Sequence, residues 1–297
     1  MTTPGSAPGE WRNAAMRFLF LAGDPMNSPR LKSIVKLFET CRYKHDIYTV
    51  FSDWCESSAI ALSNAMDRVH AEKRETRFQE IARKYGTETM GIFSKIMGEV
   101  VLALDDRPHD VLGATFHELG LHDKAHGQFY TPYPVCQLMA RMVAGSPEEM
   151  RKVLERRGFM LAQEPAVGSG AMIIALTEAI LEAGFNYQQL LHVTAVDIDP
   201  RAAHMAYIQF SLLHIPATVI VGDSLAMRFS DQWYTMAHIM GGWSAKLRRA
   251  GEAATADAPM LAPAMMAPGP KVAMASSPAR RTAPEPASEK NGQLRLF

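Results

Sequence analysis

The sequence is poor in cysteine and has no closely spaced cysteine pair. Its 297 residues include only Cys41, Cys55 and Cys136, which are scattered and show no CxxC spacing. An odd, scattered set argues against a disulfide framework and against a thiolate zinc site. The expectation is therefore a reduced cytoplasmic protein without a bound metal.

Long apolar runs and an excess of either charge are also missing. The apolar runs are short and interrupted by charges, so no membrane span is expected. Residues 18–23 are apolar but too short for a signal-peptide core. Lys+Arg and Asp+Glu both number 31, which excludes a protein held on nucleic acid mainly through phosphate charge. Excess positive charge is confined to 231–297, with 8 basic and 5 acidic residues.

Aromatic residues are absent from 250–292, where 13 of 43 residues are Ala and 7 are Pro. Scattered prolines interrupt helices and strands, and few large apolar groups remain to offset the entropy of ordering. This composition predicts a disordered linker between a folded part and the last five residues.

Helical spacing dominates residues 27–126, which follow a short N-terminal segment, 1–26. Apolar positions mixed with charges predict a helix over 58–81. Gly86 then predicts a stop, with Thr87 as the cap of the next helix. In that helix apolar residues recur at i+4: Ile92, Ile96, Val100 and Leu104. Residues 27–126 are therefore predicted to form an all-helical module.

Strands and helices alternate in the next part of the chain. Short apolar runs at 159–162, 192–196 and 217–221 predict strands, and helices are expected between them at 171–183 and 201–213. This order is typical of βαβ units and predicts an α/β fold with a parallel sheet.

Each predicted strand ends in residues suited to a nucleoside ligand. Gly168 and Gly170 form a turn that lets backbone approach a ligand, next to free N–H groups of a helix. Asp197 can accept ribose hydroxyls, and Asp223 can accept from an exocyclic amine. A lone Gly-x-Gly is more often only a turn. Three such features at successive strand ends favour a ligand site, because ligands bind at the carboxyl ends of parallel strands.

Four motifs appear in one order: Gly127-Gln128-Phe129-Tyr130-Thr131-Pro132, Glu164-Pro165-Ala166-Val167-Gly168-Ser169-Gly170, Val196-Asp197-Ile198-Asp199-Pro200 and Gly222-Asp223-Ser224-Leu225. They resemble the cofactor half of adenine-N6 DNA methyltransferases, and most of all the modification subunits of type I restriction systems. Upstream, Asp110-Val111-Leu112-Gly113 with Glu118-Leu119 resembles the end of that family's helical domain. The resemblance implies a class I, Rossmann-like methyltransferase domain over 127–249.

The resemblance also implies S-adenosylmethionine as cofactor, with DNA and a restriction–modification subunit as partners. Asp197 would bind the ribose, Ile198 would lie beside the adenine, and Asp223 would meet the adenine amine. Phe129, Thr131 and Pro132 would lie against the methionine and adenine ends of the cofactor. The residues that would hold the methionine part are Glu164, Ala166, Gly168, Ser169 and Gly170.

The family's catalytic signature, Asn or Asp followed by Pro-Pro-aromatic, is missing. The sequence has no Pro-Pro, and none of its asparagines precedes a proline. Residues 231–235 stand where the catalytic strand is expected, which makes Asp231, Trp233 and Tyr234 weak catalytic candidates. The favoured alternative is that Trp233 and Tyr234 cover the open edge of an incomplete sheet. Methyl transfer by the chain alone is expected to be very slow or undetectable.

A metalloprotease reading of residues 117–122 fails on spacing. HExxH places its histidines at i and i+4 on one helix face, whereas His117 and His122 are five apart. Histidines on a helix end near the cofactor pocket, without a metal, are the favoured interpretation.

The last residues, Gln293, Leu294, Arg295, Leu296 and Phe297, resemble the peptide with which bacterial proteins bind the replication sliding clamp. A glutamine followed by large apolar residues on a flexible tether suits an apolar groove. Three hypotheses follow. The chain is an adenine-N6 methyltransferase, a non-catalytic cofactor-binding relative that regulates a restriction–modification or DNA-associated complex, or mainly a clamp-docking protein.

Overall fold

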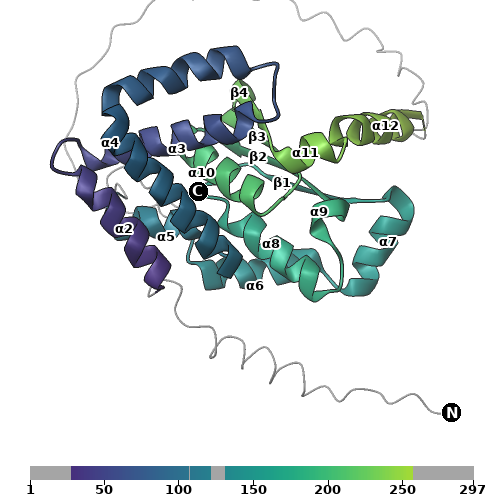
Figure 1. The fold of residues 1–297 in the computed structure, drawn as a ribbon. Coiled ribbons are helices and arrows are strands. Elements are labelled where there is room, and N and C mark those ends of the chain that lie inside the picture. The colour runs from purple at the N-terminus through teal and green to yellow at the C-terminus, as the bar shows by residue number, and fades with distance from the viewer. Residues whose placement is uncertain (1–27, 107, 122–130, 257–297) are drawn as a thin grey trace, which may run out of the picture. The chain divides into compact units, whose positions relative to one another are not determined.

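A computed structural model describes residues 28–106, 108–121 and 131–256 (Figure 1). The first described elements are helices, in agreement with the predicted helical module. They are α2 (Pro29–Cys41), α3 (Ile47–Asn64), α4 (Ala71–Asp106) and α5 (Val111–Glu118). Side chains of Ser28, Asp46 and Asp110 accept backbone N–H groups at the starts of α2, α3 and α5, as N-cap residues do.

Strands and helices then alternate as predicted. The elements are α6 (Tyr133–Ala144), α7 (Pro147–Arg157), β1 (Met160–Glu164), α8 (Ala171–Glu182), α9 (Tyr187–Leu190), β2 (Leu191–Asp197), α10 (Pro200–Leu212), β3 (Ala217–Asp223), β4 (Arg228–Tyr234), α11 (Met236–Met240) and α12 (Trp243–Ala256). The sheet has the order β1-β2-β3-β4. Its first three strands are parallel, and β4 runs antiparallel to β3.

The sheet has helices on both faces. On one face α10 packs against β2 and β3, over the buried residues Val193, Ala195 and Val219. The opposite face buries His192, whose ring lies 5.3 Å from that of Trp243 at the start of α12. On the outer side of α10, α3 packs against it (Figure 1), so the helical module and the sheet share one hydrophobic core.

The two edges of the described sheet differ. β4 closes the edge next to β3, whereas β1 pairs only with β2 among the described residues. A groove of about 800 Å³ runs beside β1 and is lined by residues of α6, α7 and α8. Leu161 on β1 is 49% exposed there. The described sheet therefore has an incomplete, Rossmann-like form.

Two boundaries differ from the sequence predictions. The single helix predicted over 58–81 is wrong, because α3 ends at Asn64 and α4 begins at Ala71. Residues between them form a turn in which the Asp67 carboxylate accepts from the backbone N–H of Val69. The stop at Gly86 is confirmed as a kink, since its φ of 68° and ψ of 173° interrupt α4. α12 also continues to Ala256, past the expected start of the linker.

Candidate cofactor site

The turn after β1 has the conformation that the two glycines predict. Gly168 and Gly170 have φ values of 56° and 101°, which residues other than glycine rarely adopt. A Cβ on Gly170 would also lie 2.6 Å from the ring of Phe210. Gly170 is the N-cap of α8 and makes no side-chain cap, so the first N–H groups of α8 keep their capacity to bind a ligand.

Asp197 at the end of β2 ties this turn to the next one. Its Oδ2 accepts from the Gly168 N–H at 2.8 Å, and its Oδ1 accepts from the Asp199 N–H at 2.9 Å. A carboxylate has about four acceptor positions, so the arrangement leaves capacity for two hydroxyl donors. Burial raises the pKa of the Asp197 carboxyl, while the two backbone N–H groups act in the opposite direction.

The strand register places three carboxylates on one side of the sheet. Glu164 is paired with Ala195, two residues before Asp197, and Asp197 is paired with Val221, two residues before Asp223. Side chains two apart on a strand point to the same face, so all three share it. Strand spacing and rise put successive Cα atoms about 8 Å apart. Together they form a diagonal row across the carboxyl ends of β1, β2 and β3.

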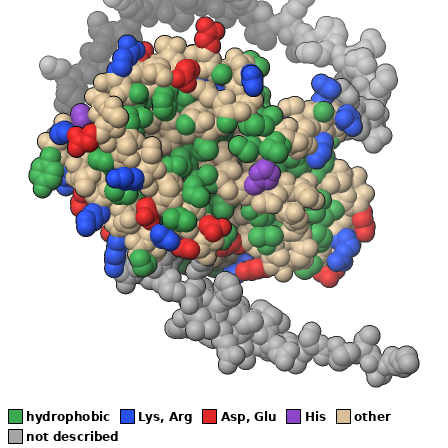
Figure 2. All heavy atoms as spheres, in the orientation of Figure 1, with side chains coloured by type: hydrophobic (Ala, Val, Ile, Leu, Met, Phe, Trp, Pro, Cys, Tyr) green, Lys and Arg blue, Asp and Glu red, His purple; other side chains and the backbone are tan. Residues whose placement is uncertain are grey.

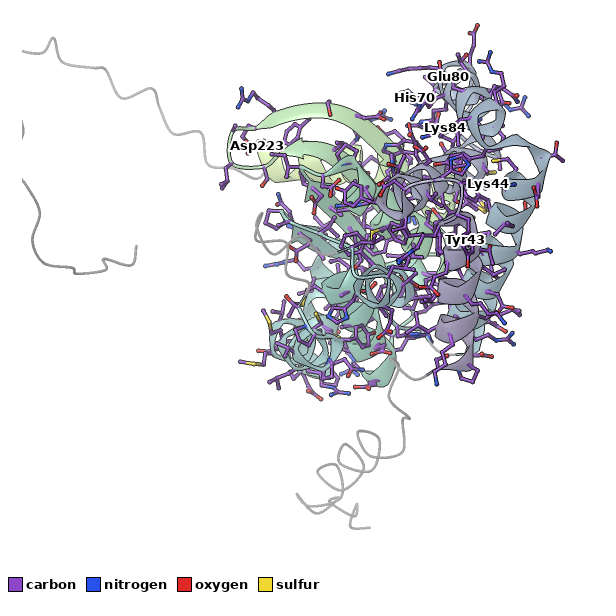
Figure 3. The ribbon with its side chains drawn as sticks, turned by 90° about the vertical axis from the view of Figure 1, so that its left-hand side faces the viewer. Tyr43, Lys44, His70, Glu80, Lys84 and Asp223 are labelled. Atoms are coloured by element: carbon purple, nitrogen blue, oxygen red, sulfur yellow. The ribbon has the colours of Figure 1, made fainter. Side chains whose placement is uncertain are left out.

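The outer two carboxylates of this row have different surroundings. Burial raises the pKa of the Glu164 carboxyl, which accepts from the Ala166 N–H at 3.3 Å. Asp223 accepts from the N–H groups of Leu225 and Ala226, both at 2.9 Å. Figure 3 shows Asp223 near the end of the sheet, away from the labelled side chains of the helical module. Both therefore stabilise their own turns and keep oxygens for a ligand.

The remaining predicted cofactor residues vary in exposure. Ile198 is 69% exposed beside Asp197, so its side chain is accessible at the end of β2. Thr131 and Pro132 are exposed just before α6. Ala166 is exposed in the turn, but Ser169 is only 1% exposed. Phe129 and the rest of its motif before Thr131 lie outside the described residues.

The three weak catalytic candidates lie on β4, separated from β1 by β2 and β3. Residues 231–234 belong to this strand, which runs antiparallel beside β3, and their catalytic role stays a prediction. Trp233 is 3% exposed, with the Arg74 guanidinium 3.7 Å from its ring centre. Asp231 lies 3.7 Å from Arg74, and the ring of Tyr234 is 4.7 Å from that of His238. Trp233 has no open face for a base and closes the sheet edge instead.

The structure adds residues that sequence reasoning did not place at the site. Asp110 and Gln209 are buried and hydrogen-bond to Ser169 in the glycine turn. Asp110 belongs to the Asp110-Val111-Leu112-Gly113 motif, so the resemblance to the methyltransferase family could have pointed to it. Gln209 lies in α10, and nothing in the sequence pattern of that helix indicates a role at the site.

The part of the chain that the structure describes contains neither a cluster of metal-binding side chains nor a membrane-spanning helix. No group of three or more potential metal ligands occurs there. His117 is exposed on α5, while His122 lies outside the described ranges. Among these same residues, no helix has the length and apolarity to cross a bilayer.

Charge of either sign is interspersed on the face shown in Figure 2. Basic and acidic side chains stand near one another around most of its rim, with apolar side chains between them, and a small basic group stands alone where α12 lies. This face therefore shows no broad basic patch among the described residues of the kind that phosphate binding favours.

The parallel strands, glycine turn and acidic strand ends define an α/β protein with a Rossmann-like sheet. Residues 116–246 match the sequence model of the family N-6 DNA Methylase. This match confirms the predicted resemblance to adenine-N6 DNA methyltransferases over that part of the chain. Among curated proteins, no sequence matches the chain.

Two solved structures show a distant likeness. One is described as a class I S-adenosylmethionine-dependent methyltransferase from Listeria monocytogenes, with 13% identity, a TM-score of 0.37 and coverage of 68% of this chain. The other is a type I restriction-modification methyltransferase subunit from Streptococcus thermophilus, with 15% identity, a TM-score of 0.27 and coverage of 63%. The likeness spans 56% of each of those chains.

Proposed function

We propose that this chain binds S-adenosylmethionine at the carboxyl ends of β1 and β2, as a member of the adenine-N6 methyltransferase family. The observation that carries the proposal is the hydrogen bond from the Gly168 N–H to Asp197, which brings a carboxylate next to a turn whose Gly168 and Gly170 carry no side chain. Such a carboxylate suits two ribose hydroxyls. The cofactor, when bound, supplies a methyl group on a sulfonium.

The chain's own residues suit binding and orientation of that cofactor. The Asp197 carboxylate accepts the ribose hydroxyls, and the free N–H groups at the start of α8 face the methionine end. Ile198 covers one face of the adenine, and Asp223 accepts from its amine. Thr131, Pro132, Glu164 and Ala166 border the same space. Ser169 acts through the backbone of the turn, because its side chain is buried.

Methyl transfer by this chain alone is a separate question. The family's Asn/Asp-Pro-Pro-aromatic signature is absent from the sequence, and Asp231, Trp233 and Tyr234 lie on the far strand of the described sheet. We therefore propose a cofactor-binding relative with little or no activity of its own, which acts in a DNA-associated or restriction–modification complex.

A calorimetric titration with S-adenosylmethionine tests the binding proposal. Asp197→Ala should weaken binding by roughly 10- to 100-fold for each ribose hydroxyl that loses its acceptor, because each charge-assisted hydrogen bond is worth about 1.5–3 kcal/mol. Asp231→Ala is the matched control, since it removes a carboxylate from β4 and should leave the affinity unchanged. Absence of binding by the parent protein at millimolar cofactor would refute the proposal.

A transfer assay with labelled cofactor and unmethylated DNA tests the second part. The parent chain should give little or no labelled DNA, even where calorimetry shows binding. Robust adenine methylation by the purified chain would overturn the non-catalytic assignment.

A second function is favoured by the C-terminal sequence. Gln293, Leu294, Leu296 and Phe297 match the pattern of a sliding-clamp peptide, and 250–292 would serve as its tether. Residues 257–297 lie outside the described part of the chain, whereas 250–256 belong to α12. Docking to the clamp would raise the local concentration of the folded part near newly made DNA.

A further inference from the structure

A buried carboxylate joins the helical module to the glycine turn. Asp110 is 8% exposed and stands at the start of α5. Its Oδ2 accepts from the Ser169 hydroxyl at 2.6 Å, and its Oδ1 accepts from the Gly113 N–H at 2.9 Å. The same carboxylate therefore caps a helix of one part of the fold and holds the turn of another.

Gln209 on α10 completes the connection. Its Nε2 donates to Asp110 Oδ1 at 2.9 Å and to the Ser169 carbonyl at 2.7 Å, while its Oε1 accepts from the Leu112 N–H at 3.2 Å. Every side-chain polar atom of Gln209 is thus paired, although the residue is fully buried. Such a satisfied network specifies one arrangement, since each lost partner would leave a buried polar group unpaired.

The groups of this network are closely packed. A Cβ on Gly113 would collide with the Asp110 carboxylate and lie 2.7 Å from the Ser169 hydroxyl. Ser169 itself is 1% exposed, between the two glycines whose backbone faces the proposed cofactor site. The side chain of Ser169 is therefore turned inward toward α5 while its neighbours remain available to a ligand.

We propose that Asp110 is a positioning residue for the cofactor turn and that it couples docking of α5 to cofactor binding. The coupling to cofactor binding rests on the proposed function, because its ligand is S-adenosylmethionine. The structural half of the proposal, that Asp110 fixes the conformation of the turn, does not depend on any ligand. Asp110 holds Ser169 and thereby fixes Gly168 and Gly170. A ligand that requires this fixed turn should in return stabilise the first turn of α5, because such coupling is reciprocal.

Hydrogen exchange without ligand tests the structural half. In Asp110→Ala the amides of Gly168 and Gly170 should exchange at least tenfold faster, although their acceptors, Asp197 and the Val167 carbonyl, remain. Asp46→Ala is the matched control, because Asp46 caps α3 in the same way and touches no residue of the turn. Equal exchange of the turn in both variants would overturn the proposal.

Calorimetry tests the coupling to the cofactor. Ser169→Ala and Asp110→Ala should each weaken S-adenosylmethionine binding by about tenfold, or about 1.4 kcal/mol, and Asp46→Ala should not. Asp110→Asn should restore much of the affinity, because its amide oxygen still accepts from Gly113 and Gln209 and its amide nitrogen can donate to the Ser169 hydroxyl.

The outcomes separate this proposal from the proposed function. If the parent protein binds no cofactor, the proposed function and the coupling both fail, while the exchange result alone decides whether Asp110 fixes the turn. If the parent binds and the Asp110 and Ser169 variants bind equally well, only the coupling is refuted.

Discussion

Acidification from pH 7 to pH 5.5 should destabilise this protein through three buried histidines. His192 and His238 hydrogen-bond to each other at 2.9 Å, and His204 packs edge-on against Trp233. Burial lowers the pKa of each of these histidines to about 4. In the unfolded chain the pKa of each histidine is near 6.5. The unfolded state therefore binds more protons than the folded state between about pH 4 and pH 6.5.

Because the unfolded state binds more protons, the free energy of unfolding falls as pH drops through this window. With a pKa of about 4 in the folded state and about 6.5 in the unfolded state, each histidine lowers the free energy of unfolding by about 1.2 kcal/mol between pH 7 and pH 5.5. The three together lower it by about 3–4 kcal/mol. Glu164 and Asp197 have raised pKa values and act in the opposite sense, so they reduce the net loss.

Urea denaturation at the two pH values measures this effect. His204→Gln should remove about a third of the histidine contribution to the pH dependence. Thr177→Ala is a suitable control, because it removes a buried hydroxyl without a titrating group and should leave the pH dependence intact. Equal stability of the parent at pH 7 and pH 5.5 would refute the assignment of neutral, buried histidines.

Three further predictions follow from the site and the tail. Trp233→Ala should destabilise the fold by about 3–5 kcal/mol in denaturant titrations while Trp233→Phe costs less; a wild-type stability of the alanine variant would contradict its edge-closing role. Cofactor affinity should fall on acidification at a pH above the usual aspartate range, since burial raises the pKa of Asp197, and calorimetry across pH should show a flatter profile for Asp197→Asn. Replacing Leu296 and Phe297 with alanine should abolish co-purification with the sliding clamp and leave cofactor binding unchanged; retained clamp binding would mark the motif as a coincidence.

Local patterns predicted the α/β half well. The runs at 192–196 and 217–221 are mostly buried on both faces of a parallel sheet, and their richness in valine, isoleucine and threonine makes them easy to recognise as strands. Gly86 was also recognisable as a helix break, because its φ of 68° needs a glycine. In contrast, the turn between α3 and α4 contains Met66 and Val69, which continue an apolar helical pattern and hid the interruption.

The position of β4 could not be predicted from its own residues. A strand at 228–234 has the same local pattern whether it pairs beside β1 or beside β3. Its place is fixed by contacts from far along the chain, including the donation of Arg74 Nη2 to the Gln232 carbonyl at 2.8 Å. The inward turn of Ser169 was missed for the same reason, since its partner Asp110 is 59 positions away.

The central claim is that the turn after β1 and the end of β2 bind S-adenosylmethionine. Hydrogen exchange of the parent protein with and without S-adenosylhomocysteine tests it most directly. The account predicts slower exchange at Gly168 and Gly170 and in residues 197–199, with no change on β4. Slowing confined to other parts of the chain, or no slowing at saturating ligand, would contradict the account.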